Sequence, residues 1–162
     1  MQSSLRVFDV VRFGLGMART TAKMASGPAA GCHAMHAITF IIDRDSVCAG
    51  DDTEPHQATV SLPATVTLPD LIAAARRACP LASIAGGQAT WLIDIGSPAR
   101  CIGVIAQQWS VPQLLAMESS VAALCGDGPC MLHFRYWGQS DPQAVVDALR
   151  AGRPIPERAA TG

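Results

Sequence analysis

Residues 65–80 read TVTLPDLIAAARRACP and contain the clearest helix signal in the chain. Thr67 can cap a helix whose first turn holds Pro69, where the missing N–H does no harm, and Asp70 stands three residues after the cap, as in a capping box. Apolar residues then recur at helical spacing, at Leu68, Leu71, Ile72, Ala75 and Cys79. We predict an amphipathic helix that ends at Pro80 and packs one face on a core.

Segments of alternating polarity flank this helix on both sides. They are residues 36–43 (HAITFIID), 57–62 (QATVSL), 89–95 (ATWLIDI), 101–107 (CIGVIAQ) and 129–137 (PCMLHFRYW). A period of two is typical of a strand with one buried face, here illustrated by Ile38, Phe40 and Ile42. We predict five strands, one or two helical turns within 112–124, and a last helix over 141–150.

The predicted order is strand, strand, helix, strand, strand, short helix, strand. Over residues 36–138 this order, with the Thr67-x-x-Asp70 helix start, resembles the β-grasp or ubiquitin-like superfold. The resemblance implies an α+β fold in which a mixed sheet of about five strands packs on one main helix, with a C-terminal helix added. It also implies that the fifth strand lies between the first and the third.

Such a fold hosts sulfur carriers, ferredoxins, adaptors and inhibitors, so the fold alone does not give the function. The chain lacks the cysteine-rich cluster loop of a ferredoxin. A helix follows its last strand at the place where a sulfur carrier has Gly-Gly. We therefore expect neither of these two activities.

Charge and composition divide the chain into three predicted regions. Residues 1–34 carry a net charge of +3 and residues 35–162 a net charge of −4. The first region has no apolar run long enough for a signal peptide or a membrane span. We expect a disordered or spurious N-terminal extension over 1–34, the β-grasp-like domain over 35–150, and a flexible tail over 151–162.

The six cysteines form no C-x-x-C pair. Their positions are Cys32, Cys48, Cys79, Cys101, Cys125 and Cys130. Sparse spacing in a chain of this length favours reduced, mostly buried thiols and a cytoplasmic location. Neither Cys32-His33-x-x-His36 nor Cys125-x4-Cys130 has the paired short spacings of a structural zinc site.

An acidic loop, DRDSVCAGDD at residues 43–52, joins the first two predicted strands. Its carboxylates approach the spacing of a calcium loop, but Val47 holds a ligand position and Cys48 replaces the glycine of the sharp bend. We therefore expect no metal there. Two interpretations stay open: a solvated hairpin tip, or carboxylates that pair with basic groups of a partner.

The sheet face opposite the main helix is expected to mix apolar, charged and aromatic side chains. These are Thr39, Ile41, Leu92, Asp94, His133, Arg135 and Trp137. Trp and Arg are favoured at protein-binding surfaces. The final helix could instead cover this face with Val145, Val146 and Leu149, and Trp109 could either anchor a partner or pack beneath 112–124.

We expect a non-catalytic protein-binding module, such as an immunity- or antitoxin-like inhibitor or an adaptor. The expected contact residues are Asp43, Asp45, Asp51, Asp52, Trp109, His133, Arg135 and Trp137. The expected partner is another protein that carries basic groups, because an acidic body disfavours nucleic acid; we expect no membrane, cofactor or metal. The alternative is a metal-binding or thiol-dependent enzyme that uses Cys48, His56 and the acidic loop.

Overall fold

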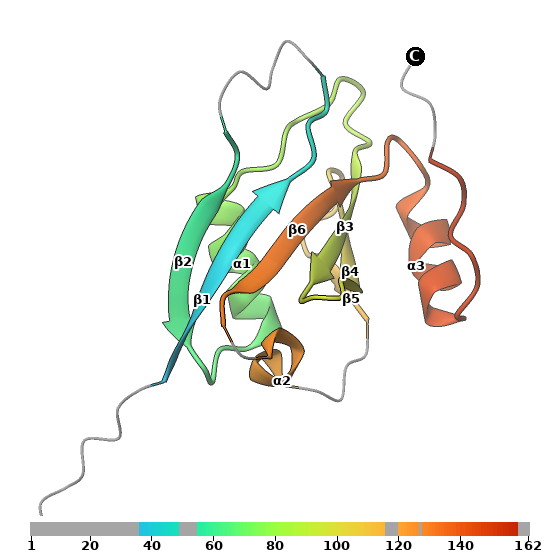
Figure 1. Cartoon of the computed structure of the whole chain (residues 1–162). Coiled ribbons are helices and arrows are strands. Elements are labelled where there is room, and N and C mark those ends of the chain that lie inside the picture. The colour runs from blue at the N-terminus through green and yellow to red at the C-terminus, as the bar shows by residue number, and fades with distance from the viewer. Residues whose placement is uncertain (1–35, 49–54, 116–119, 127, 159–162) are drawn as a thin grey trace, which may run out of the picture. The chain divides into compact units, whose positions relative to one another are not determined.

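The computed structural model describes residues 36–48, 55–115, 120–126 and 128–158 (Figure 1). In chain order its elements are β1 (Ala37–Arg44), β2 (Ala58–Pro63), α1 (Leu68–Ala78), β3 (Thr90–Ile95), β4 (Arg100–Ala106), β5 (Gln113–Leu114), α2 (Val121–Cys125), β6 (Cys130–Tyr136) and α3 (Pro142–Arg150). The predicted N-terminal extension and the acidic tip with Asp51 and Asp52 lie outside the described residues.

The strands form one mixed sheet in the order β2-β1-β6-β3-β4-β5. β1 and β6 run parallel, and the other neighbouring strands run antiparallel. The α+β class is therefore confirmed. The strand predicted over 129–137 does lie between the first and the third, so the chain's two most distant strands meet in the middle of the sheet.

α1 begins as the sequence predicts. The Thr67 hydroxyl accepts the Asp70 N–H at 3.3 Å and donates to the Asp70 carboxylate at 2.6 Å. Leu71, Ile72 and Ala75 then pack on the inner face of the sheet, which completes the main core. The expected inner face is confirmed, since the residues buried with α1 include Phe40, Ile42, Trp91, Ile93, Leu132, Phe134 and Tyr136.

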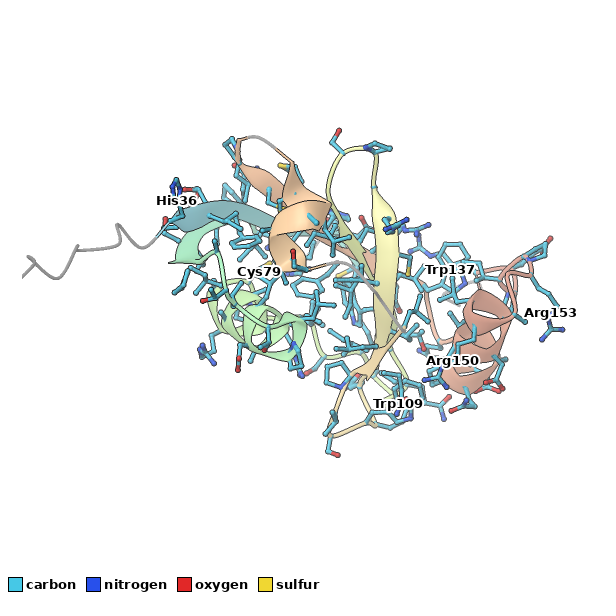
Figure 2. The ribbon with its side chains drawn as sticks, turned by 90° about the horizontal axis from the view of Figure 1, so that it is seen from below. His36, Cys79, Trp109, Trp137, Arg150 and Arg153 are labelled. Carbon is cyan, nitrogen blue, oxygen red and sulfur yellow. A yellow bond between two sulfur atoms is a disulfide. The ribbon has the colours of Figure 1, made fainter. Side chains whose placement is uncertain are left out.

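α3 packs on the opposite side of the sheet from α1 (Figure 2). Asp141 caps it by accepting the Gln143 N–H at 3.0 Å. Val145 and Val146 bury Leu92 and Val104. Every residue of β3 is buried, although its sequence alternates. The final helix therefore covers the outer face over β3 and β4.

One edge of the sheet differs from the prediction. One or two helical turns were predicted within 112–124, and the short helix α2 at Val121–Cys125 agrees with this, but Gln113–Leu114 forms a strand, β5, that was not predicted. The Leu115 N–H donates to the Ile102 carbonyl at 3.0 Å, which draws this segment onto β4. Glycine at position 103 permits the approach, because a Cβ there would lie 2.8 Å from the Gln113 carbonyl oxygen.

The expectation that all thiols are reduced is wrong for Cys125 and Cys130, which form a disulfide. The end of α2 and the start of β6 bring their Cα atoms to 4.9 Å, inside the usual range of about 4.4–6.8 Å for a disulfide. The fold creates this approach, and sequence spacing does not reveal it. Cys79 is buried as expected, whereas Cys101 is half-buried and Cys48 is exposed.

Candidate partner-binding surface

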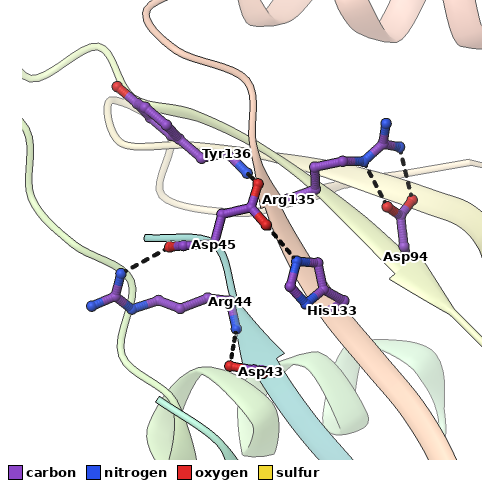
Figure 3. Close-up of polar contacts among 7 residues, drawn as sticks. All are labelled: Asp43, Arg44, Asp45, Asp94, His133, Arg135 and Tyr136. Carbon is purple, nitrogen blue, oxygen red and sulfur yellow. Dashed lines mark hydrogen bonds and ion pairs between the residues drawn. The ribbon is translucent and has the colours of Figure 1, made fainter. Parts of the chain in front are cut away.

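Asp45 follows the last residue of β1 and ties this strand end to β6 (Figure 3). One carboxylate oxygen lies 2.6 Å from Nε2 of His133, and the other accepts the Tyr136 N–H at 3.0 Å. The Asp45 N–H donates to the Phe134 carbonyl at 2.9 Å. Three contacts to β6 hold Asp45 and His133 in one geometry, yet their side chains remain 32% and 38% exposed.

Arg135 and Asp94 form the second ion pair of this surface. Nε of Arg135 donates to one carboxylate oxygen at 2.8 Å, and Nη2 donates to the other at 3.2 Å. Such a two-point contact fixes the guanidinium plane as well as its distance. The side chain of Asp94 is only 10% exposed, while that of Arg135 is 40% exposed, so a buried carboxylate holds an accessible guanidinium in place.

Strand register places these groups in a row across the outer face. His133 lies opposite Asp43 on β1 and opposite Asp94 on β3, and residues opposite one another share a face of the sheet. Asp43 accepts the N–H of Arg44 at 2.8 Å. We call Asp43, Asp45, Asp94, His133 and Arg135 the His133 cluster; its three carboxylates face one guanidinium, which leaves an excess of negative charge.

Trp137 borders the His133 cluster on the side nearer α3. Its ring lies 5.4 Å below the Arg135 guanidinium, a cation–π contact. Its indole N–H donates to the Pro156 carbonyl at 2.9 Å, and the ring also packs on the cluster of α3. Trp137 is thus a partly covered wall of the surface.

β1, β2 and β6 carry the other half of the outer face. Figure 1 shows α3 beside β3 and β4, away from β1 and β2. Thr39 and Ser61 meet through their hydroxyls at 3.4 Å, and Met131 is 40% exposed. No helix among the described residues packs on this half, so it forms a partly apolar surface next to the His133 cluster.

The structure brings together five of the eight predicted contact residues: Asp43, Asp45, His133, Arg135 and Trp137. Trp109 packs on the cluster of Leu92 and Val104 beneath α3, on which Trp137 also packs. Asp51 and Asp52 lie outside the described residues.

Two residues of this surface were missing from the predicted contact set, Asp94 and Met131. The sequence signal for Asp94 is a carboxylate inside the strand ATWLIDI, since a charge in a buried strand needs a partner. Met131 alternates with Leu132 in β6 and therefore had to face outward.

The alternative site at Cys48 and His56 gains little support. Cys48 is exposed and His56 is half-buried, and the residues between positions 48 and 55 are not described. Among the described residues, no three His, Cys, Asp or Glu side chains are grouped as metal ligands. Cys101 lies opposite Asp94, and burial raises its pKa, which disfavours the nucleophilic thiolate.

Comparisons with protein-family models, with curated proteins and with solved structures found no match for the chain. No helix in the described part of the chain has the length and apolar character needed to span a bilayer.

Proposed function

We propose that the chain is a non-catalytic protein-binding module of ubiquitin-like type, and that the His133 cluster is its contact surface. The observation that carries the proposal is the pairing of half-exposed His133 and Arg135 with the carboxylates Asp45 and Asp94. Asp45 is bonded to the backbone of β6, and two side-chain bonds join Arg135 to Asp94 on the neighbouring strand, so a partner meets charged groups that are already ordered. Pre-ordered groups lower the entropic cost of binding.

The charge of the surface supports a partner with basic groups. Asp43 and Asp45 contribute carboxylates that lysine or arginine of a partner can pair with, and complementary charge speeds association more than it tightens binding. Met131 and the adjacent half of the outer face add apolar area. An immunity- or antitoxin-like inhibitor, or an adaptor, would use a surface of this composition.

Capture of a partner on the immobilised full chain tests this proposal. The informative variant is Asp43→Asn with Asp45→Asn, because asparagine can still accept the backbone N–H bonds that these two carboxylates accept. Asp147→Asn, an exposed carboxylate on α3, is the matched control. We expect the double variant to slow association about tenfold at low salt, and the control to bind as the unmodified chain does.

Three outcomes would contradict the proposal. The first is a captured partner that binds the double variant with unchanged kinetics. The second is an association rate that does not fall as salt is raised, since exposed charges are screened within about 8 Å at physiological ionic strength. The third is stoichiometric metal in the purified protein, which would favour the alternative centred on Cys48 and His56.

A further inference from the structure

A cavity of about 300 Å³ lies between α1 and the residues that lead into β5. Pro69, Ile72 and Ala73 form its helical wall, and Val111, Pro112 and Leu114 form the wall opposite. Val111 is 66% exposed, a large value for an apolar side chain next to a cavity. A volume of this size accommodates one or two apolar side chains, or a small ligand at the lower limit of about 300–1,000 Å³ for ligand sites.

Among the described residues, Arg76 supplies the only charge in the lining of this cavity. It lies in the last turn of α1 and is exposed. Within the described part of the chain, no hydrogen bond or ion pair joins its guanidinium to another residue. The cavity therefore combines apolar walls with one guanidinium that can donate hydrogen bonds to a carboxylate.

The outer edge of β5, with which no other strand pairs in the described part of the chain, borders the same cavity. β5 is the last strand of the sheet. Because the Leu115 N–H bonds to Ile102, and bonded pairs alternate along antiparallel strands, the N–H and C=O of Leu114 point away from β4. The Leu114 side chain lines the cavity at the same time, so a backbone donor and acceptor stand beside the apolar walls.

We propose that this groove binds an extended segment of a partner protein. The segment pairs with β5 as an added strand, places an apolar side chain against Ile72 and Val111, and directs a carboxylate to Arg76. Strand addition draws affinity from backbone bonds and specificity from side-chain pockets. The backbone groups of Leu114 favour a peptide over a small amphipathic acid, which would leave them unused.

This site is separate from the surface assigned above. It lies on the α1 side of the sheet, whereas the His133 cluster lies on the α3 side. Failure of either proposal therefore leaves the other standing.

A displayed library of random peptides of roughly ten residues, panned on the immobilised full chain, provides the probe. We expect enriched peptides to carry an apolar residue followed closely by Asp or Glu. A synthetic copy of one such peptide should shift the backbone amide signals of Ala73 and Leu114 in a ¹⁵N-labelled sample. No enrichment, or shifts confined to the His133 cluster, would overturn the proposal.

Two pairs of matched variants locate the binding contacts. Arg76→Glu should weaken the selected peptide about threefold or more, whereas Arg77→Glu, in the same helical turn, should leave its Kd unchanged. Ala73→Trp should fill the groove and weaken binding about tenfold or more, whereas Ala78→Trp should not. All four positions are exposed on α1, so the fold should tolerate each change.

Equal losses for each variant and its control would refute the assignment. Decanoate is a second probe that tests for a small-ligand pocket instead of a peptide groove. If decanoate shifts the amide signal of Leu114 and none of the selected peptides does, the site binds small amphipathic acids and the peptide proposal is wrong.

Discussion

Replacement of Arg135 by methionine should destabilise the fold through the carboxylate that it leaves behind. Methionine keeps an apolar stem beside Trp137 but removes both bonds to Asp94. The Asp94 side chain is only 10% exposed, so water replaces those bonds poorly. Bonds to a charged group contribute about 1.5–3 kcal/mol. We expect Arg135→Met to lower the free energy of unfolding by about 2 kcal/mol. This is less than the roughly 3–5 kcal/mol lost when a fully buried ion pair is broken, because Arg135 is 40% exposed.

The reverse replacement should be milder. Asp94→Asn leaves a half-exposed guanidinium that water can hydrate, so we expect a loss of about 0.5–1 kcal/mol. The variant with both changes no longer buries an unpaired charge. Its loss should therefore be smaller than that of Arg135→Met alone, at about 1 kcal/mol. The two single losses would then exceed the double loss by about 1.5–2 kcal/mol, which is the coupling free energy between the two side chains.

Urea unfolding, followed by circular dichroism, measures these free energies for the unmodified chain, the two single variants and the double variant. With a slope of about 1–3 kcal/mol per molar urea, a loss of 2 kcal/mol moves the midpoint by about 1 M. The reasoning fails if Arg135→Met costs less than about 0.5 kcal/mol. It also fails if the two single losses add to the double loss within about 0.3 kcal/mol, the result expected for independent sites.

Three further changes test other parts of the structure. Tyr136→Phe should be neutral or slightly stabilising, because its buried hydroxyl has no hydrogen-bond partner among the described residues; a loss above about 1 kcal/mol in urea unfolding would reveal one. Reduction of Cys125–Cys130 should cost about 2 kcal/mol for so short a loop and lower Tm by about 6 °C, and an unchanged Tm under reductant would contradict this. Burial raises the pKa of the Cys79 thiol above its ordinary 9.0, so the folded state holds this proton more tightly than the unfolded state does. Stability should therefore be complete below pH 9.0 and fall as pH rises from there towards the folded pKa; an equal fall in Cys79→Ala would show that another group is responsible.

Local signals in the sequence predicted most of the elements. The cap at Thr67 and the alternation in the strands both depend on neighbours within a few residues, and these patterns matched α1 and five of the six strands. β5 was missed because two residues are too few to show alternation. The disulfide was missed because the distance between Cys125 and Cys130 depends on how the end of α2 is placed next to the start of β6. The spacing of the two cysteines in the sequence does not predict that placement.

The candidate surface was predicted only in outline. Alternation places His133 and Arg135 on the outer face, but their carboxylate partners lie 88 and 41 residues away in sequence. These residues, which are far apart in sequence, come into contact only because of the register of β6 with β1 and β3. The apolar face of α3 likewise predicts that this helix is packed against the rest of the fold. That it packs on β3 and β4 depends on the path of the chain after Tyr136, which the sequence pattern does not give.

The central position of β6 has a consequence for the chain during its synthesis. On the ribosome, β1 and β2 and then β3 and β4 are synthesised before the strand that joins these two pairs, β6. Until then each half presents an unpaired inner edge and an apolar face to its surroundings. Contacts of such sequence separation form slowly, and early species with open edges tend to associate. The nascent chain therefore stays vulnerable to misassembly until β6 has emerged and joined the two pairs of strands.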